Sequence, residues 1–417
     1  MDSNKPALSI DSINKTITVF VSLYSLTLWI NFIITVNTGK YNGDLMGIDV
    51  GQGVDDLFYI ALLNQFFLLL AIVIFRLLNS KNVTIGNVYF FLNERRFSIF
   101  FFIIVVLSMI FFYSTGVGKV YSTKTHVLKP LFLIIEPGNI FFLYYLLVRK
   151  SSEKLFFINV GLYSILQISK GWTSFILMIG MFELYFFILK HNASRFFKIP
   201  LMFSLIVPVV LLACGGFVYK YAFLMKNEVR GVSVESVSLT YTDSITLLAS
   251  RLSNYTISAG VNSRLDRVVS VVKQQGEFSE LKSFANFSKY FIPNSSNDVE
   301  ARPLSNSVML AFYPMFGAKY SNVEIGMFTY YQTLFKVDAC EAVFVAFITF
   351  FMLITLFFFY KIITNNNKHV ELLLFCMVFY FLYTMCSPVY FIKPYITGVF
   401  LLPFLFMFGV FKIKKRY

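Results

Sequence analysis

Ten long apolar runs constrain this chain more than any other feature of its sequence. A helix rises about 1.5 Å per residue, so a run of roughly 20 apolar residues matches the hydrocarbon core of a membrane. Little more than Lys170-Gly171 separates the fifth run from the sixth, and this boundary is the least distinct. The runs predict ten transmembrane helices, at residues 16–37, 57–78, 97–118, 130–148, 155–169, 172–190, 199–219, 340–361, 370–392 and 394–411.

The composition agrees with a fold embedded in lipid. The 417 residues are 57% hydrophobic and only 14% charged, whereas soluble domains average about 45–50% apolar and about 25% charged residues. These figures exclude a soluble globule and a disordered chain. Four cysteines without a CxxC pair exclude a disulfide scaffold and give no support for a zinc site.

The distribution of basic residues predicts the orientation in the membrane. The net charge is +14. With the N-terminus in the cytoplasm, 18 Lys and Arg residues fall in inner segments and six in short outer segments, as the positive-inside rule requires. The first run follows a polar head that lacks a small-residue cleavage site, so we expect a retained anchor. We therefore predict an all-α polytopic membrane protein with both termini inside.

Residues 220–339 form one long segment that this orientation places outside. It carries 12 basic and 10 acidic residues, and its periodic apolar residues predict a mainly helical layer on the membrane surface. The chain thus divides into transmembrane helices 1 to 7 (1–219), a large periplasmic loop (220–339), and transmembrane helices 8 to 10 with a basic cytoplasmic tail (340–417). Helices are expected at 243–257, 263–273 and 279–291, and after the capping box Ser321-Asn322-Val323-Glu324.

Several classes of chemistry find no support in the sequence. There is no P-loop, GxGxxG, HExxH or GxSxG motif, and among three histidines only His126 is placed outside. The inner loops are too short for a nucleotide-binding domain. No basic-aromatic strip occurs outside the apolar runs, so a nucleic-acid partner is not expected. We expect no metal and no cofactor, and any reaction is expected at the outer face.

Outer cations are the first candidates for a functional site. Arg264 and Arg267 are spaced i,i+3 on one predicted helix, Arg251 lies on the preceding helix, and Lys170 lies between two spans. Guanidinium forks and lysine charges match phosphate oxygens, so these residues could clamp a lipid-linked pyrophosphate. In the alternative interpretation, Arg264 only forms surface ion pairs with Asp266 and Glu280.

Acidic residues form a second group of candidates. A carboxylate inside a span is costly and usually faces a cavity or a partner, which draws attention to Glu136 and Glu183. Glu136 is followed by Pro137-Gly138, which can break the fourth helix and open a wet cavity, so Glu136 is the candidate base. The alternative for both glutamates is a hydrogen-bonded structural role. Asp55-Asp56 could form a base or a metal site, or could be only solvated surface. If Glu136 is not the base, Asp243 and Glu324 are the next candidates.

Short motifs in a fixed order give the chain a resemblance to a known family. They are Ser169-Lys170-Gly171-Trp172-Thr173, Ser250-Arg251-Leu252-Ser253, Phe291-Ile292-Pro293, Arg302-Pro303, Tyr320-Ser321 and Ile325-Gly326-Met327-Phe328-Thr329-Tyr330-Tyr331. In this succession and in its overall layout the chain resembles the O-antigen and oligosaccharide repeat-unit polymerases (Wzy). It departs from them at Phe335-Lys336, where the family often has Phe-Gly, and in the spacing from Arg251 to Gly260. The related ligases have a histidine in the large loop, and 220–339 has none.

The resemblance implies a glycosyltransferase of GT-C-like architecture in the bacterial inner membrane, with its active site facing the periplasm. Such an enzyme transfers a growing glycan from undecaprenyl pyrophosphate to the non-reducing end of another lipid-linked repeat unit. Its partners are this lipid-linked oligosaccharide, the surrounding membrane lipid and a possible chain-length regulator protein. Two alternatives stay open: a lipid-linked oligosaccharide flippase, and a membrane glycosyltransferase that uses a lipid monophosphate sugar. The implied catalytic residues are Glu136 and Arg251, and the implied pyrophosphate- and substrate-binding residues are Lys170, Arg251, Arg264, Arg267, Arg302 and Tyr320.

Overall fold

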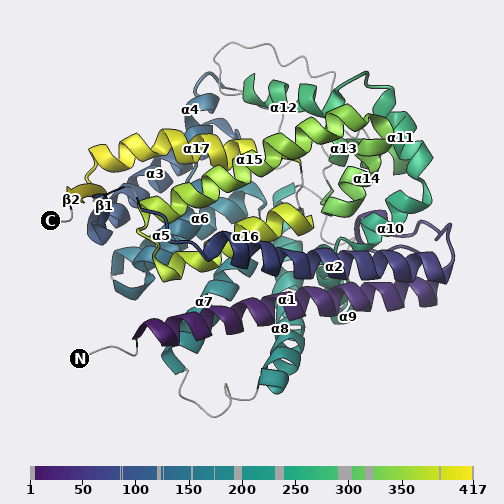
Figure 1. The fold of residues 1–417 in the computed structure, drawn as a ribbon, viewed down its shortest axis with the longest axis horizontal. Coiled ribbons are helices and arrows are strands. Elements are labelled where there is room, and N and C mark those ends of the chain that lie inside the picture. The colour runs from purple at the N-terminus through teal and green to yellow at the C-terminus, as the bar shows by residue number, and fades with distance from the viewer. Residues whose placement is uncertain are drawn as a thin grey trace.

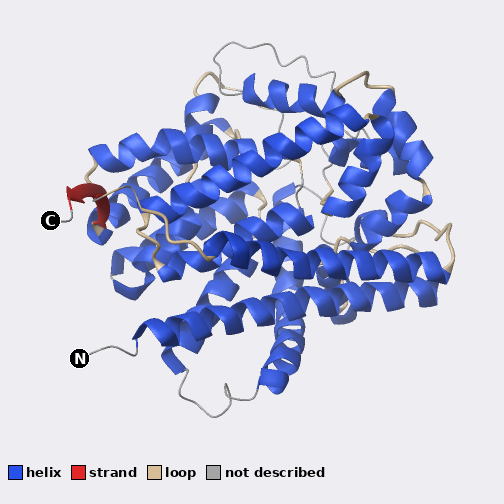
Figure 2. Cartoon of the chain, in the orientation of Figure 1, coloured by secondary structure: helices blue, strands red, loops and turns tan. Residues whose placement is uncertain are grey.

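The computed structural model is mostly helical (Figure 2). It describes residues 5–84, 86, 88–119, 124, 126–151, 154–172, 174–191, 200–230, 239–289, 303–314, 323–384 and 387–415. The first part of the chain forms α1 (Lys5–Thr38), α2 (Val54–Asn79), α3 (Glu94–Thr115), α4 (Lys129–Ile134), α5 (Gly138–Val148), α6 (Lys154–Lys170), α7 (Phe175–His191) and α8 (Pro200–Arg230).

The segment predicted to lie outside is helical too, as its periodicity indicated. It forms α9 (Tyr241–Arg251), α10 (Tyr255–Ser263), α11 (Leu265–Lys273), α12 (Ser279–Lys289), α13 (Leu304–Phe312) and α14 (Met327–Val337). The chain then returns to long apolar helices, α15 (Ala339–Ile363), α16 (Glu371–Phe379) and α17 (Pro388–Met407). One turn of π-helix, Tyr380–Thr384, extends α16.

Six helical segments in the described ranges are long and apolar enough to cross a membrane. They are Asp11–Thr38, Val54–Asn79, Glu94–Thr115, Lys129–Val148, Ser204–Met225 and Ala339–Ile363, which coincide with the first four, the seventh and the eighth apolar runs. The mostly helical fold is therefore confirmed, and the six candidate spans agree with a polytopic membrane protein. The total of ten spans stays a prediction, because α6 and α7 have only 17 residues each and α16 has nine.

The fourth span is broken where the sequence indicated. α4 ends at Ile134 and α5 begins at Gly138. Proline has no backbone N–H to donate and clashes with the preceding turn, so Pro137 stands at the N-cap of α5 and not inside a continuous helix. The break leaves Glu136 in the short connection between α4 and α5.

A short antiparallel strand pair was not predicted. Strand β1 (Val88–Leu92) pairs with β2 (Phe411–Lys415), and Val88 lies opposite Lys415. The alternation of Phe411-Lys412-Ile413-Lys414 has the period of a strand, and Lys414 Nζ lies 4.6 Å from the ring centroid of Phe91. The tenth apolar run therefore leaves its helix at Met407, before the predicted end of the run at residue 411.

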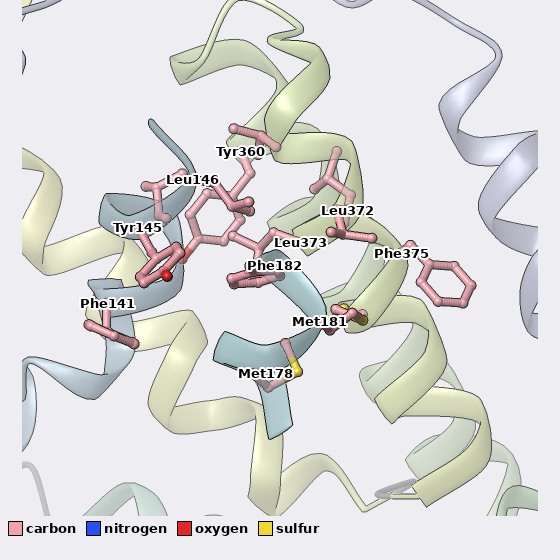
Figure 3. Close-up of a cluster of buried hydrophobic side chains, with 14 of the residues drawn as sticks. Phe141, Tyr145, Leu146, Met178, Met181, Phe182, Tyr360, Leu372, Leu373 and Phe375 are labelled. Atoms are coloured by element: carbon pink, nitrogen blue, oxygen red, sulfur yellow. The ribbon is translucent and has the colours of Figure 1, made fainter. Parts of the chain in front are cut away.

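The helices form a bundle with an additional layer at one end. In Figure 1, α1 and α2 lie side by side, both termini lie at the left, and α11, α13 and α14 lie at the right. One core fills the bundle; Figure 3 shows the part where Tyr145 and Leu146 meet Phe182, Tyr360 and Leu373. A second core joins the outer helices to the ends of α1, α2 and α15, so the outer layer is packed onto the bundle.

Candidate functional site

Helix α9 carries Arg251 in its last turn and is held firmly from both ends. At its start, Thr240 and Asp243 form a capping box, in which Thr240 Oγ1 accepts from the N–H of Asp243 at 3.1 Å. Thr240 in turn donates from its hydroxyl and its backbone N–H to Asp243 Oδ2, and these two hydrogen bonds hold the pKa of Asp243 below its usual range. Near the other end, the side-chain amide of Asn31 on α1 donates to the carbonyl of Ala249 at 2.9 Å. Asp243 is thus occupied by helix capping.

Two glycines let α9 lie very close to α8. A Cβ atom at Gly216 would meet Ile245 Cγ1 at 2.5 Å, and one at Gly215 would meet Leu248 Cδ2 at 2.9 Å. Real Cβ contacts are longer than this, so only glycine permits the observed approach. The approach sets the position of α9 and hence of Arg251.

Arg251 is held by Asp44 in a two-pronged ion pair. Its Nη1 donates to Asp44 Oδ2 at 2.9 Å, and Nη2 lies 2.7 Å from Oδ1. Asp44 belongs to the single turn Gly43–Leu45, and Gly43, with φ of 65°, sits against Ser250. Burial lowers the pKa of Arg251, but Asp44, Tyr219 and Glu324 raise it by more, so its pKa lies above its ordinary value.

Glu324 carries a carboxyl group that solvent reaches although protein groups surround it. Its side chain is exposed, whereas Val323 and Ile325 on either side are buried. Burial nevertheless raises the pKa of Glu324 to about 7; Arg251 opposes this rise and Asp44 adds to it. Because its side chain is exposed and yet desolvated, we infer that Glu324 lines a recess that water enters and protein surrounds. We call the group of Arg251, Asp44 and Glu324 the Arg251–Glu324 recess.

The recess reaches into the transmembrane bundle. Glu324 interacts electrostatically with Tyr24 of α1 and with Tyr380 of the π-helix. Just after it, Gly326 packs closely, because a Cβ there would lie 3.4 Å from Asn64 Oδ1 and from the carbonyl of Tyr383. The amide of Asn254 donates a hydrogen bond to that same carbonyl. The chain around Glu324 is thus inserted between spanning helices.

Arg264 and Arg267 lie together in a different cavity. This outer cavity, of about 340 Å³, is lined by Arg264, Arg267, Asn262, Gln332 and Lys336, with Asp266 beside them. The guanidinium carbon of Arg264 lies 5.2 Å from the ring centroid of Phe312. Lys336 lies 3.8 Å from Asp266 in an exposed pair. The two arginines therefore line one cavity, but Arg264 lies at the junction of α10 and α11 and not on the same helix as Arg267, which differs from the predicted single helix.

Glu280 is not the ion-pair partner that its sequence position suggested. It is 1% exposed, accepts from the Tyr330 hydroxyl at 2.9 Å and from the N–H of Leu304 at 2.7 Å, and also accepts from Ser387. Burial raises the pKa of Glu280. Glu341 in turn accepts from the N–H of Glu280 at 2.7 Å. These buried carboxylates join α12, α13, α14, α15 and the start of α17.

Lys170 and Glu136 meet in a third place. Lys170 Nζ donates to Glu136 Oε1 at 2.9 Å, and Lys170 is only 6% exposed. Both line a cavity of about 70 Å³ between α3, α4 and α6. The structure thus pairs these two predicted residues with each other, whereas Arg264 and Arg267 line the outer cavity. Arg302 and Tyr320 lie outside the described residues.

The remaining acidic candidates are Glu183 and the pair Asp55-Asp56. Glu183 accepts from Arg149 Nε at 2.7 Å and Nη2 at 3.1 Å, and also from Tyr145, which agrees with its structural interpretation. Asp55 and Asp56 stand in the exposed first turn of α2. Within the described ranges, no group of three or more acidic, histidine or cysteine residues could hold a metal.

The pairing of Asp44 with Arg251 and the depth of Glu324 are the features that sequence reasoning missed. Asp44 is more than 200 residues from Arg251, and no local pattern links them. The motif segment Ile325–Tyr331 lies close to Asn254, the residue that follows Ser250–Ser253, since a Cβ at Gly326 would lie 3.6 Å from Asn254 Nδ2. Comparison with known proteins gives no further guide, because no family model, curated protein or solved structure matches the chain.

Proposed function

We propose that this protein polymerises lipid-linked oligosaccharide repeat units at the outer face of a bacterial inner membrane. It transfers the growing glycan from undecaprenyl pyrophosphate to the non-reducing end of another lipid-linked unit. The observation that carries this proposal is the Arg251–Glu324 recess, where an accessible base of suitable pKa lies close to an accessible guanidinium. Two motif segments of the polymerase resemblance, Ser250–Ser253 and Ile325–Tyr331, contain or adjoin residues of this recess, which supports the proposal.

The two side chains supply the chemistry that glycosyl transfer needs. Glu324 takes the proton of the acceptor hydroxyl, and the hydroxyl oxygen then attacks the anomeric carbon of the donor sugar. The bond from this carbon to the pyrophosphate oxygen breaks, and the bonding electron pair leaves with the pyrophosphate. Arg251, held by Asp44, stabilises the negative charge that develops on this leaving group. No nucleotide and no metal take part in the proposed reaction.

Glu324 fits the role of base better than Glu136 does. A base must be ionised at working pH and within reach of the substrate. Glu324 has a pKa of about 7 and an exposed side chain. Glu136 is mostly buried and one of its oxygens already binds Lys170. We therefore assign proton transfer to Glu324 and a binding role to the neighbourhood of Glu136.

The glycan profile of a deletion strain, complemented with single variants, tests the proposal. Glu324→Gln and Arg251→Ala should abolish polymer and leave complete single repeat units at the outer face, with normal protein levels. Glu277→Gln, which removes an exposed acid elsewhere in the outer layer, is the matched control and should give a normal ladder. Units retained inside would indicate a flippase, incomplete units would indicate a glycosyltransferase of the monophosphate type, and a normal ladder from Glu324→Gln would refute the assignment.

A further inference from the structure

The outer cavity has the composition of a site for an acidic carbohydrate. Its volume of about 340 Å³ falls within the roughly 300–1,000 Å³ of small-molecule sites, and among the described lining residues only Leu265 is apolar. We propose that this cavity binds a sugar residue of the repeat unit that carries a carboxylate, and that Arg264 and Arg267 bind this carboxylate. The inference rests on the proposed function, because it names the class of glycan that the reaction extends.

Positive charge predominates around the outer cavity. Arg264, Arg267 and Lys336 line it together with one acidic residue, Asp266. Asp266 lies 3.8 Å from Lys336, and its side chain is 99% exposed. A solvent-exposed ion pair of this kind is weak, so the two guanidinium groups dominate the charge of the cavity. Guanidinium forks match the two oxygens of a carboxylate, and the cavity therefore favours an anionic ligand.

Arg264 is held against an aromatic ring. Its guanidinium carbon lies 5.2 Å from the ring centroid of Phe312, and Phe312 is buried. Arg264 also stands at the junction of α10 and α11, so two helices fix its backbone. A planar guanidinium that stacks on a ring is preorganised, and it loses less freedom when it binds an anion. Arg267 follows three residues later on α11 and lines the same cavity.

Two side-chain amides supply hydrogen-bonding groups for sugar hydroxyls. Gln332 on α14 donates to Asn262 Oδ1 at 3.2 Å, and Asn262 donates to Gln52 Oε1 at 3.4 Å. These hydrogen bonds fix the amides of Gln332 and Asn262 at the cavity wall. Gln332 Oε1 is buried and has no hydrogen-bond partner in the described part of the chain. A buried acceptor without a donor is unfavourable, and a hydroxyl group of a bound sugar is a donor that this oxygen lacks.

The polar lining distinguishes the glycan from the lipid part of the substrate. The cavity is formed by α10, α11 and α14, which have nine, nine and 11 residues and are too short to cross a membrane. An isoprenoid chain needs an apolar path from its pyrophosphate into lipid, whereas the sugars of a lipid-linked unit extend away from the membrane. We therefore assign Arg264 and Arg267 to the glycan and not to the pyrophosphate.

The outer cavity adjoins the Arg251–Glu324 recess. Asp44 of the recess is followed by Leu45, which packs on α10, because a Cβ at Gly260 would overlap Leu45 Cδ1. The same Cβ would lie 3.4 Å from Phe312 Cζ, and Phe312 is the ring that contacts Arg264. The recess and the cavity are thus separated by one layer of packed side chains. A sugar in the cavity is accordingly close to the sugar that reacts in the recess.

Binding of two acidic trisaccharides, trigalacturonate and sialyllactose, tests the assignment. Purified full-length protein in nanodiscs is titrated with each and followed by saturation-transfer NMR. The wild type should bind at least one of them about tenfold more tightly than its methyl ester, which has the same rings without the charge. Arg264→Gln and Arg267→Gln should each weaken this binding about tenfold, and Arg267→Lys should weaken it less. Lys273→Gln, which removes an exposed charge at the end of α11, is the matched control and should bind as the wild type does.

Other outcomes overturn the inference, each for its own reason. Equal binding of acid and ester, or unchanged binding by both arginine variants, would show that these residues do not recognise a carboxylate. An equal loss in Lys273→Gln would indicate diffuse surface charge, and displacement by inorganic phosphate at the same concentration would indicate a site for any anion. Failure of the proposed function is seen separately, as a normal glycan ladder from Glu324→Gln, and does not change the binding of the trisaccharides.

Discussion

Glu324 makes the proposed reaction sensitive to pH near neutrality. Its pKa of about 7 results from burial, opposed by Arg251 and reinforced by Asp44. A general base acts only when ionised, so the rate of polymerisation should rise as pH increases through about 7 and level off above it. Initial rates measured with reconstituted protein between pH 5.5 and 8.5 should show this rise. A flat profile would exclude Glu324 as the base.

The contribution of Glu324 to the stability of the folded state should fall as pH rises. The native pKa of Glu324 lies above its ordinary value, so the native state binds the proton more tightly than the unfolded state does. The stability contributed by the protonated group is present at low pH and is lost as pH rises toward 7. Glu324→Gln stays neutral, and its melting temperature relative to wild type should be higher at pH 8 than at pH 5. An equal difference at both values would contradict a desolvated carboxyl.

Asp44 should act by positioning Arg251. Its two oxygens meet the two terminal nitrogens of the guanidinium at 2.7 and 2.9 Å, a geometry that a lysine cannot reproduce. Asp44→Asn should therefore reduce polymerisation by roughly tenfold or more, with little change in protein level. Arg251→Lys should restore only part of the activity that Arg251→Ala loses. Glycan ladders at matched expression measure both effects, and full activity of Asp44→Asn would show that Arg251 needs no such support.

At the level of secondary structure, the sequence predicted the long apolar helices, but it did not predict the strand pair or the π-helix. Apolar runs of span length identify α1, α2, α3, α8 and α15 because composition alone determines whether a helix is stable in lipid. The strand pair of β1 and β2 depends on contacts between residues more than 300 positions apart, and the carbonyl of Tyr383 in the π-helix accepts a hydrogen bond from Asn254, 129 positions away. Such tertiary contacts leave no local pattern.

The contact between α8 and α9 can be tested by a paired substitution. Gly216→Ala places a methyl group 2.5 Å from Ile245 Cγ1, so the Ile245 side chain or α9 as a whole must shift, at a cost of about 1–3 kcal/mol. We expect α9 to shift, which moves Arg251 and should lower polymerisation. Ile245→Ala removes the clashing atom, and the double variant should recover part of the loss. Additive effects of the two substitutions on the ladder would show that the contact does not position Arg251.

For the whole molecule, the predicted orientation assigns the chain ends and the helices of 239–337 to opposite sides of the membrane. Figure 1 places both chain ends at the end of the bundle opposite α11, α13 and α14, and the 18-to-six distribution of basic residues favours the cytoplasm for the ends. The recess of Arg251 and Glu324 lies where the outer helices meet the bundle. A polymerase needs this recess to face the periplasm, because its lipid-linked substrates are exposed on that side.

Cysteine labelling decides the orientation directly. In a background with the four native cysteines replaced by serine, Lys273→Cys on the exposed side of α11 should react with a membrane-impermeant maleimide in spheroplasts. Lys412→Cys on β2 should react only after the membrane is permeabilised, because the positive-inside rule places the basic end of the chain in the cytoplasm. Both variants should be labelled equally in detergent, which controls for burial. Labelling of Lys412→Cys but not Lys273→Cys in intact spheroplasts would place the recess on the cytoplasmic side, and the proposed polymerisation at the outer face would then be impossible.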